Sequence, residues 1–389
     1  MKKVAVLLAL AAAALGAVAV AFAGNSSSSA PASPSAAGKQ LIACGKTRTI
    51  GFLLPITGPA ASVGAQQNRW VKYYVSTYNK THKKKFKLHN GDTQLGNGVS
   101  FAVSAADSVV ADSKVLALVG PAGSNEVKAT TASIKGAGAA FVSGSATNTT
   151  ITTDGQRTGF FFRTVPPDAQ QGKDVATFIL THLKSKRVYI IDDQEAYSTG
   201  LADVVEGRLK SAHVVTKRDG VNQSQSDFSS VIAKIPRNYQ LIYIPWQLAS
   251  RAKAFGQQLK SAGKGSIALM GSDGLYDTQF SGLGSNVYDS MFPVAPGNKI
   301  LAAYKKKHHG NGDYFGAPSY EAAHVLGTAI DRACKNGKAT RAEVRGFIKK
   351  TSFRTSLLGL PIKFDRNGDI RRKKFGIYKS VNGKFVPIA

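Results

Sequence analysis

The sequence contains only two cysteines, fewer than half as many acidic as basic residues, and a single long apolar run. Outside that run, which covers residues 4–23, no segment is apolar over the length of a bilayer, so we expect the rest of the chain to be soluble. Several enzyme motifs are missing: there is no G-x-x-x-x-G-K-[ST], G-x-S-x-G, H-E-x-x-H or C-x-x-C. The seven histidines lack the spacing of metal ligands. We therefore expect a protein that is not an enzyme and holds no cofactor or metal ion.

The N-terminal apolar run indicates the compartment. It follows Lys2 and Lys3 and ends at Ala21-Phe22-Ala23, which places small residues at the −3 and −1 positions of a cleavage site. A membrane anchor is the alternative, since the run could just span a bilayer. The run is mostly weakly apolar alanine, which together with the A-x-A site favours a signal peptide over residues 1–23. We expect an exported protein of the periplasm, the cell surface or the extracellular space.

A stretch rich in Ser, Ala and Pro follows the predicted cleavage site. Such a composition cannot bury a core, so residues 24–46 are predicted to form a flexible tether, with folded protein beginning near Cys44. Roughly 340 residues remain, which is too many for one core and predicts two lobes.

The net charge of 51 − 23 = +28 raises the question of a polyanionic partner. The basic residues are scattered through predicted helix faces and turns, as at 83–85, 305–307 and 371–374, and no basic motif interleaved with aromatic residues stands out. The predicted export also argues against intracellular nucleic acid. We interpret the charge as solvated surface and expect no nucleic-acid partner.

The two cysteines, Cys44 and Cys334, admit two interpretations. An even number of cysteines in an exported chain favours a disulfide between them, which would link the start of the fold to a late helix. The rival is a lipoprotein cleavage box at residues 41–44 (LIAC). Such a box should adjoin the apolar run, whereas this one lies about 20 residues beyond it, so we favour the disulfide.

From Thr47 onward, short β-type runs alternate with amphipathic helical runs. A first set has strands at 48–54, 86–90, 115–119 and 140–143, and helices at 65–78, 99–111 and 124–136. A second set has strands at 160–164, 187–192, 214–218, 241–245 and 267–271, and helices at 168–183, 198–210, 227–235 and 249–262, with Asp168 and Asp227 as helix caps. This alternation predicts two parallel sheets, each covered by helices on both faces.

The last part of the chain does not repeat this pattern. Helices are expected at 299–307, 320–335 and 341–350, and strands at 362–364 and 375–381. The two strands need a partner sheet. We therefore predict that the chain crosses between the lobes more than once.

Three polar turns follow predicted strands, where ligands of α/β sheets bind. Residues 120–125 (GPAGSN) open a helix and could hold a carboxylate, although a plain helix cap with packing glycines explains them equally well. Residues 143–148 (SGSATN) form a second such turn, or an ordinary Ser/Thr turn. Residues 270–274 (MGSDG) place Asp273 beyond a strand, where it could pair with a ligand amine or simply form an Asp-Gly turn.

Several segments together carry a resemblance to a known family. They are IGFLLPITGP at 50–59 with Gly64, LVGP at 118–121 with Ser124, SATN at 145–148, FRT at 162–164 with Asp168, Gln171 and Gly172, QEAYSTG at 194–200, and FD at 364–365 with GD at 368–369. In this order and spacing they resemble the type I solute-binding proteins of ABC transporters, in the leucine/isoleucine/valine-binding family. The resemblance covers about 47–388.

The resemblance implies a fold, a partner and a function. The fold would consist of two doubly wound, Rossmann-like α/β lobes joined by a three-crossing hinge that closes on the ligand, with the crossings near Val165, Pro296 and Pro361. Lobe 1 would comprise 47–165 plus 296–361, and lobe 2 would comprise 166–295 plus 362–389. The protein would be a monomer that binds an amino acid reversibly, branched-chain amino acids being one candidate, and then docks on a membrane permease.

The resemblance also implies roles for particular residues. Ser124, Ser145 and Thr147, with the backbone at Ala146, would hold the ligand carboxylate. Asp273 would pair with the α-amino group, and Tyr197 would cover the ligand. Phe315 or its neighbour Tyr314 would line the pocket for the ligand's side chain. Val63 and Gln247 stand at two further ligand-facing positions where the family often has an aromatic residue, and Asp273 is shorter than the glutamate of the branched-chain binders.

These departures leave alternatives open. The ligand could lack an amine, as amides, urea and aromatic acids do. The chain could also be a sensor or envelope ligand-binding protein, although no signalling domain follows in the sequence. A polyanion-binding role would show itself as a steep dependence of binding on salt.

Overall fold

Two β-sheets organise the chain in a computed structural model that describes residues 38–295, 297–308, 313–372 and 374–388. The predicted signal peptide, residues 24–37 of the predicted tether, and Pro296, where a crossing was expected, lie outside the described residues. In the described part of the chain, no helix combines the length and apolar character that a membrane crossing requires.

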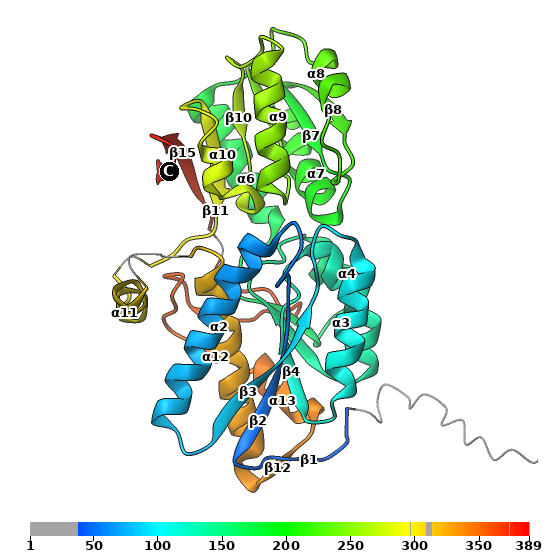
Figure 1. Ribbon diagram of the computed structural model, residues 1–389, viewed down its shortest axis with the longest axis vertical. Coiled ribbons are helices and arrows are strands. Elements are labelled where there is room, and N and C mark those ends of the chain that lie inside the picture. The colour runs from blue at the N-terminus through cyan, green and yellow to red at the C-terminus, as the bar shows by residue number, and fades with distance from the viewer. Residues whose placement is uncertain (1–37, 296, 309–312, 373, 389) are drawn as a thin grey trace, which may run out of the picture. The chain divides into compact units, whose positions relative to one another are not determined.

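The first sheet is entirely parallel, with the order β3-β2-β4-β5-β6. Its strands are β2 (Thr47–Leu54), β3 (Lys85–Asp92), β4 (Val115–Val119), β5 (Ala140–Ser143) and β6 (Phe161–Arg163). Helices α2 (Ala61–Thr81), α12 (Gly316–Ala333) and α13 (Arg341–Lys349) pack on one face, and α3 (Val99–Ala111) and α4 (Ser124–Gly136) on the other. Figure 1 shows α2 and α12 on one side of these strands and α3 and α4 on the other. Because both faces are covered, β4 and β5 are apolar and buried almost throughout.

The second sheet has the order β16-β15-β11-β10-β9-β7-β8. Five of its strands are parallel: β7 (Arg187–Asp192), β8 (Val215–Gly220), β9 (Leu241–Tyr243), β10 (Ala268–Met270) and β11 (Val287–Met291). The final strands β15 (Gly376–Val381) and β16 (Lys384–Pro387) add to it in antiparallel fashion. One face carries α6 (Asp168–Phe178), which continues as a π-helical turn (Ile179–Leu183), and α7 (Ala196–Ser211); the other carries α8 (Ser229–Lys234), α9 (Ala249–Ser261) and α10 (Thr278–Ser281).

Both sheets share one winding scheme. Numbered within its own sheet, each parallel set has the order 2-1-3-4-5, which is the doubly wound arrangement. The order reverses between β2 and β4 in the first sheet and between β7 and β9 in the second. Ligands of such sheets bind outside the carboxyl ends of the strands near this reversal. The predicted fold class, two doubly wound α/β lobes, is confirmed, and the topology directs attention to the loops after β2, β4, β7 and β9.

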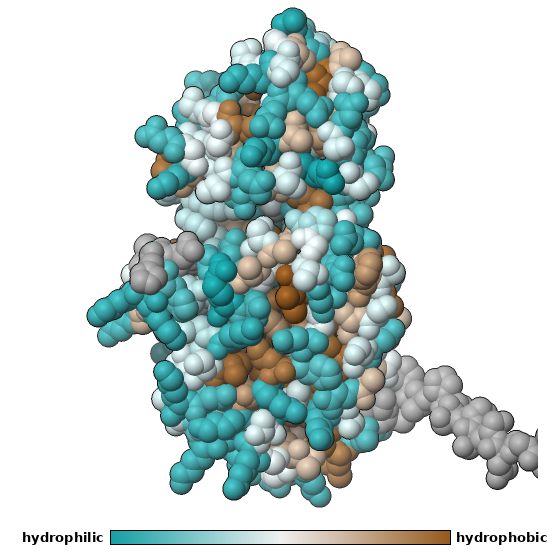
Figure 2. All heavy atoms as spheres, viewed as in Figure 1, coloured by the Kyte–Doolittle hydropathy of each residue, from teal (hydrophilic) through white to brown (hydrophobic). Residues whose placement is uncertain are grey.

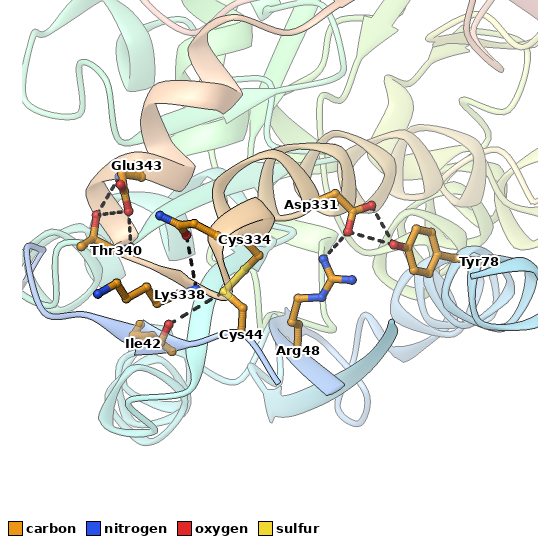
Figure 3. The surroundings of a disulfide bond; sticks show 10 residues. Ile42, Cys44, Arg48, Tyr78, Asp331, Cys334, Lys338, Thr340 and Glu343 are labelled. Carbon is orange, nitrogen blue, oxygen red and sulfur yellow. Dashed lines mark hydrogen bonds and ion pairs between the residues drawn. A yellow bond between two sulfur atoms is a disulfide. The ribbon is translucent and has the colours of Figure 1, made fainter. Parts of the chain in front are cut away.

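The start of the described chain is tied to its late part (Figure 3). Strand β1 (Ile42–Ala43) pairs with β12 (Lys338–Ala339), and Cys44 forms a disulfide with Cys334 just after α12. Residues 42–46, which we assigned to the tether, therefore belong to the fold. The disulfide also uses the sulfur that a lipid anchor on Cys44 would need.

The third crossing lies later than predicted. Strand β14 (Ile362–Lys363) pairs with β13 (Ser352–Phe353), and Ile362, Phe364 and Ile370 are buried in the core of the first lobe. The chain reaches the second sheet only at β15. The crossing therefore falls after Ile370 rather than near Pro361, because the apolar residues around β14 bury against the first sheet.

The surface agrees with the interpretation of the charge as solvated. Figure 2 shows hydrophilic side chains over most of the visible face, with hydrophobic areas between them. The large hydrophobic residues that remain exposed lie in several separate elements, among them Phe101 in α3, Val215 in β8 and Ile300 in α11 (Lys299–Lys307).

Candidate functional site

A small cavity lies where the carboxyl ends of the two sets of strands meet. Its lining comes from both lobes: Val63, Leu95, Ala122, Gly123, Ser124, Ser145 and Phe315 from the first, and Tyr197, Gln247, Asp273 and Gly274 from the second. The cavity volume is about 30 Å³, which holds only one or two water molecules. A larger ligand would need the lobes to lie further apart than they do here.

The N-terminus of α4 forms one end of the cavity. Ser124 is the first residue of this helix, and its hydroxyl accepts a hydrogen bond from the backbone N–H of Asn148 at 3.1 Å, which leaves its proton free to be donated. The Gly123 N–H, in contrast, donates to the buried carboxylate of Glu126 at 2.9 Å. Burial raises the pKa of Glu126 to about 7. The remaining N–H groups of the first turn give this end of the cavity a partial positive charge that suits an anion.

Ser145 lies beside Ser124 but its hydroxyl is already engaged. It donates to the carbonyl of Ala122 at 2.8 Å and accepts from the amide of Gln67 at 2.8 Å. The backbone N–H of Ala146 donates to Ser143 at 3.0 Å. Ser145 therefore fixes the loop after β4 against α2, and it can donate to a ligand only by releasing the Ala122 carbonyl.

The opposite end of the cavity carries a buried acid. Asp273 follows β10, is only 3% exposed, and accepts a hydrogen bond of 2.6 Å from the hydroxyl of Tyr197. The Ser272 hydroxyl lies 2.7 Å from the same tyrosine oxygen. Burial raises the pKa of Asp273 to about 6, and the hydrogen bond from Tyr197 partly opposes this rise. Asp273 is therefore ionised at neutral pH and poorly solvated, which favours a cationic partner.

Two further carboxylic acids lie close enough to Asp273 for its charge to affect their pKa values. Asp168 at the start of α6 and Asp289 in β11 are fully buried, and burial together with the charge of Asp273 raises the pKa of both. Tyr243, the last residue of β9, lies near the three aspartates, and its hydroxyl has no hydrogen-bond partner among the described residues. Asp168 was expected to cap α6; instead its carboxylate is buried as the first helical residue, with Pro167 in the cap position. The second lobe thus places an excess of acidic groups behind the cavity.

Gln247 occupies the loop after β9, next to Asp273, because β9 and β10 are neighbouring parallel strands. Its position is fixed on both sides. The Trp246 indole N–H donates to the Ile191 carbonyl at 2.7 Å. A Cβ atom on Gly274 would come within 2.9 Å of the Cα of Gln247, so only glycine allows the two loops to approach this closely.

Comparisons with known proteins agree with this geometry. A family model described as "Periplasmic binding protein" matches residues 47–383. The chain belongs to this family. A leucine-, isoleucine-, valine-, threonine- and alanine-binding protein of Pseudomonas aeruginosa is 27% identical over 351 residues, which cover 86% of this chain and 90% of that protein. The predicted resemblance to the leucine/isoleucine/valine-binding family is thereby confirmed.

Solved structures of other periplasmic binding proteins share the fold. A leucine binding protein from Thermotoga maritima has a TM-score of 0.80 at 24% identity, covering 88% of this chain and 98% of that one. A solute binding protein of an ABC transporter from R. palustris, solved in complex with benzoate, has a TM-score of 0.76 at 18% identity, covering 88% and 96%. At these identities the likeness establishes the fold and leaves the ligand open.

The structure brings together seven of the nine residues that we predicted to contact the ligand of this periplasmic binding protein. They are Val63, Ser124, Ser145, Tyr197, Gln247, Asp273 and Phe315. Ala146 and Thr147 are buried beside Ser145 but do not line the cavity. Tyr314, the alternative to Phe315, points elsewhere and packs its ring on Tyr276 with 4.3 Å between ring centroids. Whether these residues bind a ligand remains a prediction.

Sequence reasoning missed Leu95 and the acid cluster. Leu95 lies in an irregular loop after β3 and contributes to the apolar side of the cavity together with Val63 and Phe315. No motif marked it. Asp289 was missed because β11 itself was not predicted: its sequence, VYDSM, has polar residues in a strand that is buried on both faces.

Proposed function

We propose that this periplasmic binding protein is the extracytoplasmic substrate-binding subunit of an ABC importer and that it binds an amino acid reversibly between its two lobes. Several relatives of similar length are named for leucine, isoleucine and valine. Export through a signal peptide at residues 1–23 to the periplasm or cell surface, action as a monomer, and delivery of the ligand to a membrane permease belong to the same proposal.

The observation that carries the proposal is the opposite character of the two ends of the cavity. The N-terminus of α4 favours an anion, and the buried carboxylate of Asp273 favours a cation. An α-amino acid is a zwitterion whose carboxylate and ammonium group are separated by one carbon atom. It would satisfy both ends at once, with its side chain against Val63, Leu95 and Phe315.

The residues would then divide the work as follows. Ser124 donates its hydroxyl proton to the ligand carboxylate, and Ser145 assists if its hydroxyl leaves the Ala122 carbonyl. Thr147, which does not line the cavity, supports this turn from behind. Asp273 accepts from the ammonium group. Tyr197 holds Asp273 in place and covers the ligand.

Opening and closing would move the lobes about the three crossings. In the described structure the lobes touch beside the cavity: the Asn125 side chain donates to the Glu195 carboxylate at 2.8 Å, and the Asn148 side chain donates to the Ala196 carbonyl. We assign 47–165, 297–361 and 362–370 to lobe 1, and 166–295 with the chain from 376 onward to lobe 2. The closed form would be the one that docks on the permease.

The test compares leucine with two analogues that each lack one charged group. Protein without residues 1–23 is refolded to remove any ligand carried through purification, and its melting temperature is measured with leucine, with its deaminated analogue 4-methylpentanoate and with its decarboxylated analogue 3-methylbutylamine. A ligand at about 100 times its Kd stabilises the folded state by about 2.7 kcal/mol. We expect a clear shift with leucine or another amino acid of the panel and none with the two analogues of whichever binds. If no amino acid shifts the transition, the proposal is wrong.

An aromatic acid is the second candidate. It is favoured by the mostly apolar lining of the cavity and by the fold neighbour that was solved with benzoate. Benzoate would fit the α4 end of the cavity but would leave Asp273 facing a neutral ring. A shift with benzoate in the same panel, unchanged in Asp273→Asn, would select this candidate over the amino acid.

A further inference from the structure

Gln247 lines the cavity, but the polar atoms of its side chain have no protein partner, and the proposed function gives them no particular task. Both its amide nitrogen and its amide oxygen are buried, and neither has a hydrogen-bond partner among the described residues. The whole residue is 8% exposed and lines the cavity. Buried polar atoms in folded proteins nearly always have a partner, so an unpaired amide at a cavity wall indicates a partner that arrives with the ligand or with water.

The surroundings of Gln247 specify which part of the ligand it would meet. The carboxylate end of the cavity is formed by Ser124 and Ser145, and the ammonium end by Asp273. The remaining lining consists of Val63, Leu95, Ala122, Phe315, two glycines and Tyr197. Of these only Tyr197 has a polar group, and its hydroxyl is already bonded to Asp273 and Ser272. The amide of Gln247 is therefore the polar group left over for the side chain of an amino acid that occupies both ends.

The amide must both donate and accept to be satisfied. We infer that Gln247 selects an α-amino acid whose side chain both donates and accepts a hydrogen bond, namely a carboxamide or a hydroxyl, over a purely aliphatic one. This inference rests on the proposed function and refines its substrate class. A site built to bond a polar group rejects the analogue that lacks this group, because the buried polar atoms of the site are then left unpaired.

The experiment uses two pairs of ligands with nearly the same shape. Asparagine differs from leucine, and threonine from valine, in having polar groups where the partner has methyl groups. Dissociation constants of the four amino acids are measured by calorimetry for the wild-type protein and for Gln247→Met, which keeps an unbranched side chain without the amide. Gln170→Met is the control, since Gln170 bonds Asp174 on α6 and does not line the cavity.

We expect the wild-type protein to bind the polar member of at least one pair about tenfold or more tightly than the aliphatic member. Gln247→Met should reverse that preference, chiefly by binding leucine or valine more tightly, which a misfolded variant cannot do. Gln170→Met should keep the wild-type order. The asparagine and threonine pairs distinguish a carboxamide from a hydroxyl ligand.

Two results would overturn the inference while leaving the proposed function intact. One is a wild-type protein that prefers leucine and valine to their polar counterparts. The other is a preference that persists in Gln247→Met, which would mean that the amide pairs with the protein, for example with the neighbouring Gln66 or Tyr276. Binding of none of the amino acids tested, in contrast, would count against the proposed function itself.

Discussion

The two walls of the cavity are built on the same sheet topology but carry different chemistry. The first-lobe wall holds its polar groups in internal hydrogen bonds, as Ser145 does with Ala122 and Gln67, and offers mainly a helix terminus and the Ser124 proton. The second-lobe wall concentrates ionisable groups in Asp273 and, behind it, Asp168 and Asp289. A shared fold therefore fixes where a ligand lies, whereas the residues at the strand ends decide what charge it must carry.

The largest expected effect comes from removing one group from each wall. Asp273→Asn should weaken amino-acid binding by about thirtyfold or more, because truncating one partner of a buried charge pair costs about 2–5 kcal/mol. Ser124→Ala should weaken it by only about tenfold to a hundredfold, since a hydrogen bond to a charged group contributes about 1.5–3 kcal/mol. Calorimetric Kd values for the two variants check the order. Asp203→Asn is the control, because this aspartate is 69% exposed and lies outside the cavity.

If the Ser124 variant lost more binding than the Asp273 variant, the charge asymmetry between the walls would not control recognition. The unliganded Asp273→Asn protein should also melt at a higher temperature than the wild type near pH 8, since it no longer buries an ionised carboxylate. A lower melting temperature would mean that the charge of Asp273 strengthens the hydrogen bond from Tyr197 by more than the cost of burying this charge.

A pH series sharpens the same comparison. Binding of an ammonium group requires ionised Asp273, whose pKa is raised to about 6. The Kd for an amino acid should therefore stay constant above about pH 7 and rise towards tenfold per pH unit below pH 6. Asp273→Asn should lose this rise below pH 6, and any change that it keeps near pH 7 would come from Glu126, whose pKa is raised to about 7. A wild-type profile that is flat down to pH 5 would remove Asp273 from the recognition of the ligand.

The same pKa has the opposite consequence for the stability of the unliganded protein. The folded state holds a proton between the unfolded pKa of about 3.9 and the folded value, whereas the unfolded state has released it. The contribution of Asp273 to the free energy of unfolding is thus fully present below pH 4 and is lost as the pH rises through 6. Urea titrations of the wild type and Asp273→Asn at pH 5 and pH 8 isolate this contribution as the difference between the two proteins.

The smallest expected effect lies where the walls touch. Asn125→Ala removes the hydrogen bond to Glu195 and should weaken ligand binding only about two- to tenfold, because this bond is partly exposed to water and contributes about 0.5–1.5 kcal/mol. The loss should come mainly from faster dissociation, since this contact exists only while the lobes are together. Stopped-flow measurements separate the two rate constants. A slower association with unchanged dissociation would show that this contact forms before the ligand is enclosed.

Much of this arrangement could be predicted from the sequence, and the exceptions have physical causes. Helices α3, α4 and α11 and strands β4, β5 and β7 have the predicted bounds because apolar periodicity and flanking turn residues mark them. The three polar turns in the sequence indicated Ser124, Ser145 and Asp273 as candidate site residues, and all three line the cavity because strand ends converge in this topology. Periodicity could not reveal β11, because Asp289 and Ser290 are buried there despite being polar.

Other features depend on contacts that are distant in sequence. The third crossing was placed too early because the strand pattern at 362–364 does not say which sheet it joins. The buried pair of Arg163 and Asp369, with 2.6 Å between Nε and Oδ1, holds this segment to the first lobe. The role of Asp168 was misjudged for a similar reason: an acid at a helix start normally caps it, but here the carboxylate is buried near Asp273 and Thr147, which are distant in sequence.

The disulfide between Cys44 and Cys334 has a mechanical consequence. Together with the pairing of β1 and β12, it joins the first residues of the fold to the first lobe at the end of α12. A pull on the polypeptide ahead of Cys44 is therefore borne by the first lobe alone and does not load the three crossings. If the lobes open and close as proposed and the protein is held from that side, the first lobe would stay fixed and the second lobe, with its acidic wall, would move.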